Sequence, residues 1–219
     1  LESIRRLRSV DLAQFNHFVS DRLVPDDPQF STQWQYINLG NSGGTTNADF
    51  DADLAWDTTT GGLTESGDTI VICMVDEGLD ISHPDLQGNL WFNHSEIPNN
   101  NIDDDENGYI DDYRGWNVGS LNDDLESGPN AGWHGTAVAG VMGARGNNGV
   151  GVTGINWDVK IMTVVRGATM DQTLAAYSYP FAFRKMYNDT DGTEGAFVVA
   201  TNSSWGIDFG QPEEAPLWC

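Results

Sequence analysis

The sequence has little positive charge. Its 219 residues include 33 acidic but only 10 basic side chains, which gives a formal net charge of −23. An acidic chain repels phosphate groups, and this argues against binding to nucleic acid or to an anionic membrane surface through bulk electrostatics. We therefore expect a soluble protein whose solvated acidic surface attracts cations.

Cysteines and long apolar runs are also scarce. The two cysteines are Cys73, inside an apolar segment, and Cys219, the last residue. We expect Cys73 to be a buried thiol, whereas Cys219 could pair with Cys73 or with a cysteine outside this chain. No transmembrane run is present, and Leu1–Ser9 carries three arginines without the apolar stretch of a secretory signal. A start that has already been processed would look the same.

Apolar residues are nevertheless abundant enough to build a core, at 39% of the chain with eight Trp and nine Phe. Apolar, β-branched segments at 69–75, 159–165 and 196–201 are typical of strands in a parallel sheet. Helical patterns at 134–144 and at 171–187, the second interrupted by Pro180, separate these strands. This order predicts an α/β fold, a mostly parallel sheet flanked by helices.

The other segments are polar or short. We expect a short helix at 51–57 and, on a weaker pattern, a strand at 10–15. Turns or loops rich in Gly, Pro, Asn and Asp are predicted at 24–30, 40–47, 61–68 and 99–112.

The predicted helix at 134–144 contains unusually small residues. Gly135, Ala139, Gly140 and Gly143 include three glycines that lower helix propensity, so we expect these positions to allow close packing. His134 opens the otherwise apolar helix.

A carboxylate follows the first predicted strand directly. In open α/β sheets, residues just past the carboxyl end of a strand line the functional crevice. Asp76 occupies that place, and together with His134 it indicates a carboxylate that orients an imidazole base.

Three ordered segments carrying these residues resemble the subtilisin-like serine peptidases. The first is 70–86, which ends in Val-Asp-Glu-Gly-Leu-Asp-Ile-Ser-His-Pro-Asp-Leu. The second is His-Gly-Thr-Ala-Val-Ala-Gly from His134, continuing to Gly-Val-Thr-Gly-Ile, and the third is Asn-Ser-Ser-Trp-Gly at 202–206. The resemblance covers roughly residues 25 to 210 and implies the family's α/β fold, incomplete in this chain.

The resemblance implies roles for five residues. Asp76 would orient and stabilise the imidazole, and His134 would act as general base and acid. Ser204, Trp205 and Gly206 would bind an extended peptide as an edge strand. One departure from the family is Glu77, which stands where Ser or Thr is usual.

A larger departure is the missing nucleophile. The family's Ser, within Gly-Thr-Ser, and its oxyanion-hole Asn lie far downstream of the substrate segment, and this chain contains no Gly-Thr-Ser. We expect a serine endopeptidase whose nucleophile lies on a missing downstream segment or a companion polypeptide, so that this chain alone is inactive. The alternative is a non-catalytic pseudo-peptidase fragment that binds peptides or calcium.

A competing nucleophile motif is Gly-Asn-Ser-Gly-Gly at 40–44. With Ser42, Asp76 and His134 in that order it fits an α/β-hydrolase. A nucleophile elbow needs a buried strand before it and a helix after it, and both flanks here are polar, which argues against this assignment.

The acidic loop Asp-Asp-Asp-Glu-Asn-Gly-Tyr-Ile-Asp-Asp at 103–112 predicts a calcium site. Its residues match positions one, three, five, six and seven of a calcium loop, with a backbone carbonyl at seven. Arg114 occupies position twelve, where an EF-hand needs Glu, so Asp111 or Asp112 would have to complete the shell. Hard oxygen ligands favour Ca²⁺ over zinc. The predicted ligands are Asp103, Asp105, Asn107, Tyr109, Asp111 and Asp112.

A second calcium site is implied by the family resemblance alone. Asp85 lies nine residues after Asp76, as in subtilisin-like enzymes that hold calcium at the loop after the catalytic helix. That loop would supply Asn148 and the carbonyls of Val150 and Val152, and Asp27 resembles the N-terminal ligand of some members.

The resemblance also bears on domains and location. Residues 25–219 correspond to the N-terminal part of the peptidase domain, whereas 1–24 is either a propeptide remnant, as in a zymogen, or an ordinary extension. We expect a secreted, extracellular protein that acts on peptide or protein substrates.

Overall fold

The computed structural model describes residues 6, 23–41, 43–126 and 132–206. The predicted strand at 10–15, Ser42 and Cys219 lie outside these residues, as does most of 1–24, so its assignment as propeptide or extension stays a prediction. No helix among the described residues is long and apolar enough to cross a membrane.

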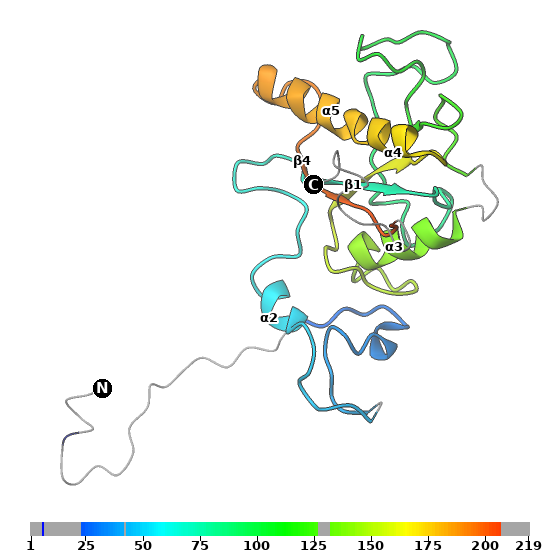
Figure 1. Cartoon of the computed structure of the whole chain (residues 1–219). Coiled ribbons are helices and arrows are strands. Elements are labelled where there is room, and N and C mark those ends of the chain that lie inside the picture. Colours follow the sequence, from blue (N-terminus) through cyan, green and yellow to red (C-terminus); the bar gives the residue numbers. More distant parts are fainter. Residues whose placement is uncertain (1–5, 7–22, 42, 127–131, 207–219) are drawn as a thin grey trace.

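A parallel sheet forms the centre of the fold. Its strand order is β2-β3-β1-β4, and every pairing is parallel (Figure 1). The α/β prediction is confirmed, and the three predicted strands form within three residues of the expected bounds. The two-residue strand β2 was not predicted, because it is too short to show a periodic pattern. The strands are β1 (Val71–Asp76), β2 (Trp116–Asn117), β3 (Lys160–Val165) and β4 (Val198–Asn202).

The predicted helices also form, with one correction. Besides the 3-10 turn η1 (Phe30–Thr32), they are α2 (Ala52–Trp56), α3 (Trp133–Gly143), α4 (Met170–Ala176) and α5 (Ser178–Asp189). The break between α4 and α5 falls at Tyr177 and not at Pro180. A proline is tolerated in the first turn of a helix but clashes with the carbonyl four residues earlier, so the chain breaks before Pro180 and α5 continues through it.

Helices cover both faces of the sheet (Figure 1). On one face, Tyr179 and Phe183 of α5 pack with Cys73 and Val75 of β1. On the other face, Ala139 and Met142 of α3 pack with Met74. Buried from both sides, β1 matches the prediction of a central strand, and Cys73 is the expected buried free thiol, whose pKa burial raises strongly.

The strand β4 is less buried than its apolar sequence indicates. Among the described residues it is the last strand on its side of the sheet, and only its first residue, Val198, is buried. Val199, Ala200 and Thr201 are exposed. An apolar strand at an open edge is a pairing surface for another strand.

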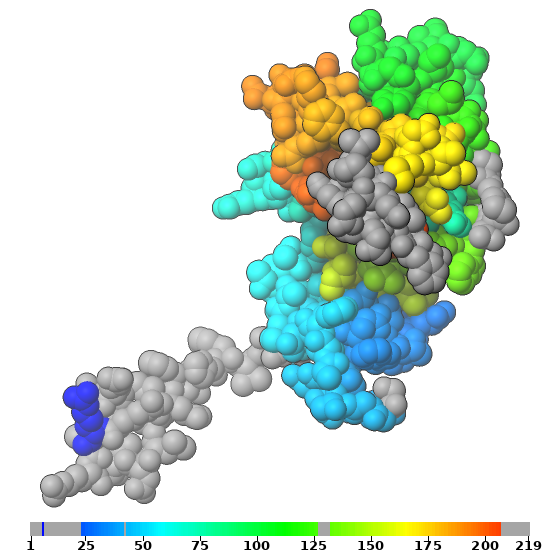
Figure 2. Space-filling view, in the orientation of Figure 1, coloured from blue at the N-terminus to red at the C-terminus, as the bar shows by residue number. Residues whose placement is uncertain are grey.

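A third core lies outside the sheet. Tyr36, Ala52 and Trp56 pack against Trp157, and the Trp56 indole donates a hydrogen bond to the Ile155 carbonyl at 2.9 Å. Residues 30–56, blue to cyan against the main body in Figure 2, therefore pack against the loop that follows α3. This contact joins α2 and the segment before it to the main body.

A close backbone contact sets the position of α3. A Cβ atom added at Gly135 would lie 1.9 Å from the carbonyl oxygen of Gly78, in the turn after β1. Gly78 has φ +109°, which only glycine adopts readily. The small-residue prediction is confirmed here and at Gly143, which meets Val159, but it is wrong for Gly140, whose added Cβ would meet nothing within 4 Å.

This difference gives a test with a matched control. Gly135→Ala should destabilise the fold by about 1–3 kcal/mol or more, because the helix must move away from β1. Gly140→Ala should be neutral or stabilise by up to about 1 kcal/mol through helix propensity. Urea unfolding of both variants checks this, and equal effects would contradict the proposed packing role of Gly135.

Candidate functional site

Asp76 and His134 meet at the carboxyl end of the sheet. The Nδ1 atom of His134 lies 2.8 Å from the Oδ1 atom of Asp76. The Asp76 side chain is 1% exposed, while that of His134 is 39% exposed. Because a carboxylate only accepts, the hydrogen must sit on Nδ1, which leaves Nε2 free to act as a base.

Neighbouring backbone amides hold both the side chain and the main chain of Asp76 in place. The Glu77 amide donates to Oδ1 at 2.8 Å, and the Arg166 amide, at the end of β3, donates to the Asp76 carbonyl at 2.8 Å. Oδ2 is buried and has no hydrogen-bond partner among the described residues. His134 sits in the first turn of α3, whose position follows from the contact between Gly135 and Gly78.

The substrate residues expected from the sequence lie beside this pair. Ser204 and Trp205 line a cavity of about 220 Å³ together with Asp76 and His134. The Trp205 indole donates to the Val75 carbonyl at 2.8 Å, which ties the segment after β4 to the end of β1. Gly206 follows directly and is exposed. Arg166 lines the same cavity, so the structure brings together residues from four separated parts of the chain.

Comparison with known proteins identifies the family. The subtilase family matches residues 67–215, about two thirds of the chain. The chain belongs to the subtilase family. It is 30% identical over 174 residues to an extracellular basic protease of Dichelobacter nodosus, covering 75% of this chain and 26% of that protein. It is 42% identical over 100 residues to subtilisin-like protease 1 of Plasmodium berghei, covering 45% and 16% respectively.

The fold of this subtilase chain also has a match among solved structures. The serine protease of Aeromonas sobria, solved in complex with a chaperone, superposes with a TM-score of 0.56 over 84% of this chain and 26% of its own, at 22% identity. This likeness concerns the fold alone. The chain spans between 14% and 26% of the length of the first curated relatives it matches.

The acidic loop folds into a compact carboxylate cluster. Ligand atoms of Glu96, Asp105 and Asp112 all lie within 4.8 Å of one another. The Asn93 side-chain amide donates to Asp105 at 3.0 Å and to Asp112 at 2.8 Å, and the Asn107 amide donates to Asp112 at 3.1 Å. Three of the predicted ligands, Asp105, Asn107 and Asp112, therefore lie together.

Glu96 was missed by sequence reasoning. It lies seven residues before the predicted loop, in a segment without a ligand pattern, and only the tertiary fold brings it to the cluster. Its Oε1 accepts from the Asp104 amide at 2.8 Å. Its Oε2 is buried without a hydrogen-bond partner among the described residues.

Two predicted ligands, Asp103 and Asp111, are not among the three converging carboxylates and accept hydrogen bonds from backbone amides. Asp103 accepts from the Asn107 and Gly108 amides at 3.0 and 2.8 Å, and so shapes the turn. Asp111 accepts from the backbone amides of residues 100 and 101. The Tyr109 amide donates to Asn107 at 2.7 Å, and the Tyr109 ring packs against residues 116 and 179.

Burial perturbs the cluster's acids. It raises the pKa of Asp112 to about 6, with the Asp105 charge adding to the effect. Burial also raises the pKa of Asp105 and, together with the neighbouring carboxylates, that of Glu96. Crowded, desolvated carboxylates are stabilised by a proton or a cation.

The residues of the second calcium prediction also come together. Asp27 and Asp85 are 4% and 1% exposed. The Asn148 side chain donates to Asp85 at 3.1 Å and its backbone amide contacts Asp27 at 3.4 Å. The Val150 amide donates to the Asn148 side chain, and the Val152 amide to Asp85, both within 2.8 Å. The loop after α3 therefore wraps around Asp85.

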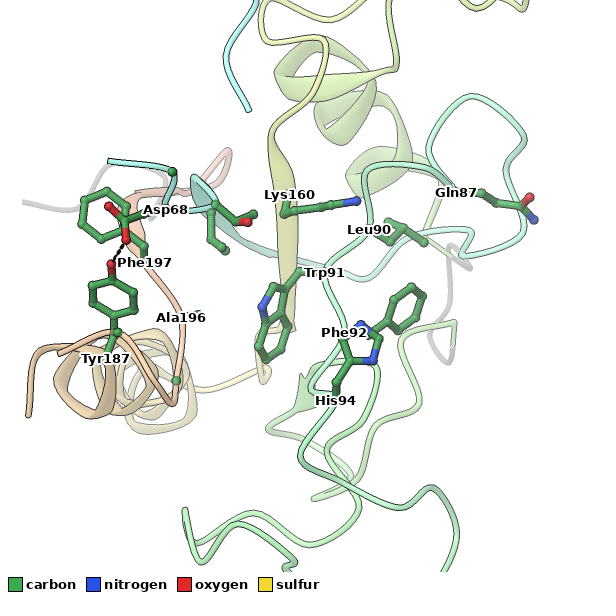
Figure 3. A pocket seen from close by; sticks show the side chains of 15 residues that line it. Asp68, Gln87, Leu90, Trp91, Phe92, His94, Lys160, Tyr187, Ala196 and Phe197 are labelled. Atoms are coloured by element: carbon green, nitrogen blue, oxygen red, sulfur yellow. Dashed lines mark hydrogen bonds between the residues drawn. The ribbon is translucent and has the colours of Figure 1, made fainter. Parts of the chain in front are cut away.

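Another cavity, of about 590 Å³, lies at the amino ends of β1 and β3, away from His134 (Figure 3). Trp91 and Lys160 line it on one side, and on the other Tyr187 is hydrogen-bonded to Asp68. None of the site residues predicted from the sequence lines it.

Proposed function

We propose that this chain supplies the acid and base of a serine endopeptidase. The observation that carries the proposal is the 2.8 Å contact between His134 Nδ1 and a fully buried Asp76 carboxylate. A buried carboxylate paired with a half-exposed imidazole is the orienting half of a catalytic triad. Membership of the subtilase family supports the same reaction.

In this mechanism His134 moves the proton. Its Nε2 takes the proton of a serine hydroxyl as that oxygen attacks the peptide carbonyl, and returns it to the departing amine. Asp76 holds the Nδ1–H tautomer and stabilises the imidazolium that forms. Water then resolves the acyl-enzyme with His134 again acting as base.

The nucleophile is proposed to come from a downstream segment or a companion polypeptide. Among the described residues no serine is hydrogen-bonded to His134, and the hydroxyl of Ser204 instead accepts from the Asn202 amide at 3.0 Å. If no serine joins the pair, the chain is the non-catalytic peptide-binding module that forms the alternative.

The peptide substrate is proposed to lie along Ser204, Trp205 and Gly206. Ser204 and Trp205 line the same cavity as His134, and an extended segment following an exposed strand can pair with a peptide by strand addition. A peptide held there would present its carbonyl beside the imidazole.

We further propose that the subtilase binds calcium at two places and is secreted. Glu96, Asp105 and Asp112 form an all-oxygen donor set, and the buried, unpartnered Oε2 of Glu96 fits a cation ligand. Asp27, Asp85 and Asn148 with the Val150 and Val152 carbonyls would form the second. The cations would tie down the loops at 77–115 and 144–159, and relatives named extracellular proteases support secretion.

Removing the base should abolish catalysis but not folding. In the protein complete with its nucleophile, His134→Ala and Asp76→Asn should each lower kcat by about 10⁴-fold, the usual scale for triad members. His94→Ala, an exposed histidine in the distant cavity, is the matched control. Peptide turnover measures this, and full activity of His134→Ala would refute the assignment.

Fluorophosphonate labelling locates the nucleophile. We expect the label on a serine outside this chain, with labelling lost in His134→Ala because the hydroxyl is no longer activated. Mass spectrometry of the labelled sample reads out the position. A protein that binds peptide but never takes the label would support the non-catalytic alternative instead.

Calcium should stabilise the fold through the Glu96 cluster. At a free concentration 100 times Kd, a bound ion adds about 2.7 kcal/mol to the free energy of unfolding. Glu96→Gln should reduce this gain, whereas Glu65→Gln, on the exposed surface, should not. Thermal unfolding with calcium and with chelator tests both, and identical calcium responses of the two variants would count against the site.

A further inference from the structure

Arg166 joins the three strand ends around the candidate active site. It follows β3, and its side chain reaches the turn after β1, where Nη2 lies 3.3 Å from Glu77 Oε1. Its guanidinium carbon lies 5.4 Å from the centre of a Trp205 ring, in the segment after β4. All three side chains line the cavity that contains His134.

The hydrogen-bond donors of the Arg166 guanidinium have few and long contacts. An arginine has five N–H donors, and the contacts here are long, at 3.3 Å to Glu77 and 3.4 Å to the Gly167 carbonyl. Nε is buried with no acceptor among the described residues. By contrast, Arg114 in the same chain binds both oxygens of Asp123 at 2.8 and 2.9 Å. Arg166 therefore keeps donors for a further partner.

We propose that Arg166 is a specificity-determining residue that binds an acidic side chain of the peptide substrate. The inference rests on the proposed peptidase function and names its substrate class. A carboxylate on a peptide lying along Ser204 and Trp205 would enter the cavity beside the guanidinium and complete its hydrogen bonds. Trp205 supports the flat face of the guanidinium.

Glu77 affects how strongly Arg166 favours an acidic substrate side chain. Its carboxylate holds the guanidinium in the cavity and competes with a substrate carboxylate for it. A basic substrate side chain would have to displace Arg166 from Glu77 and would meet its positive charge, so the pair disfavours lysine and arginine there. Since the whole chain carries a charge of −23, Arg166 has to act at contact distance and not by long-range attraction.

The test uses peptides that differ only by Glu, Gln or Lys at each of the four residues before the cleaved bond. With the active protein we expect kcat/KM for Glu to exceed that for Gln at one position by roughly fivefold to tenfold, the range for a partly exposed charged hydrogen bond. Arg166→Gln should bring this ratio close to one, and Glu77→Gln should raise it. Lys185→Gln, which removes an exposed positive charge on α5, is the control.

A ratio that stays the same in Arg166→Gln would overturn the proposal, as would a preference for Lys that disappears in Glu77→Gln. Arg166→Lys keeps the positive charge but lacks the planar guanidinium with its paired N–H donors. A Glu-to-Gln ratio of kcat/KM between those of the wild type and Arg166→Gln would show that the site of this variant is still folded.

A measurement of peptide binding tests the role of Arg166 independently of the proposed peptidase activity. Fluorescence anisotropy of the same peptides with His134→Ala protein should show the same fivefold to tenfold preference for Glu over Gln, lost in the double variant with Arg166→Gln. If the full protein with an intact His134 cleaves none of these peptides but still binds Glu in preference to Gln, the peptidase function is refuted and the role of Arg166 is supported. Equal binding of both peptides, or none, refutes the role of Arg166.

Discussion

The site depends on the contact between the backbone of α3 and the turn after β1. Any side chain at Gly135 would clash with the Gly78 carbonyl, 1.9 Å from an added Cβ, and α3 would have to move away. His134 precedes Gly135 by one residue, so the same contact sets the 2.8 Å distance from its Nδ1 to Asp76. The buried carboxylate in turn needs the imidazole, because an unpaired buried acid is costly. The packing of Gly135 against Gly78 and the hydrogen bond between His134 and Asp76 therefore depend on the same position of α3.

Some of the negative charge lies inside the molecule. Composition alone led us to expect a solvated acidic surface, yet five acids are less than 5% exposed. Asp76 contacts an imidazole, and the other four lie in the two groups of residues proposed to bind calcium. In the cluster of Glu96, Asp105 and Asp112, desolvated carboxylates so close together favour a bound cation or proton. The buried acids are Asp27, Asp76, Asp85, Glu96 and Asp112.

The parallel topology of the sheet explains why the charged side chains of Glu77 and Arg166 line the cavity beside His134. The carboxyl ends of neighbouring parallel strands meet at one edge of the sheet, so residues that follow β1, β3 and β4 become neighbours. Glu77, Arg166 and Trp205 come from these three positions and are 128 residues apart in sequence at the extremes. A substitution of any of these three side chains therefore alters the surroundings of His134.

The sequence by itself determined the α/β class, the three long strands, α3 and the pairing of Asp76 with His134, because buried strands and an ordered motif leave local patterns. It also indicated which acidic loop gathers carboxylates. Only the tertiary structure decided that Glu96 joins Asp105 and Asp112 while Asp103 and Asp111 serve the turn, and that Arg166 bridges Glu77 and Trp205. Side-chain direction in irregular loops and contacts between separate strand ends depend on the path of the whole chain, and spacing along the sequence does not encode them.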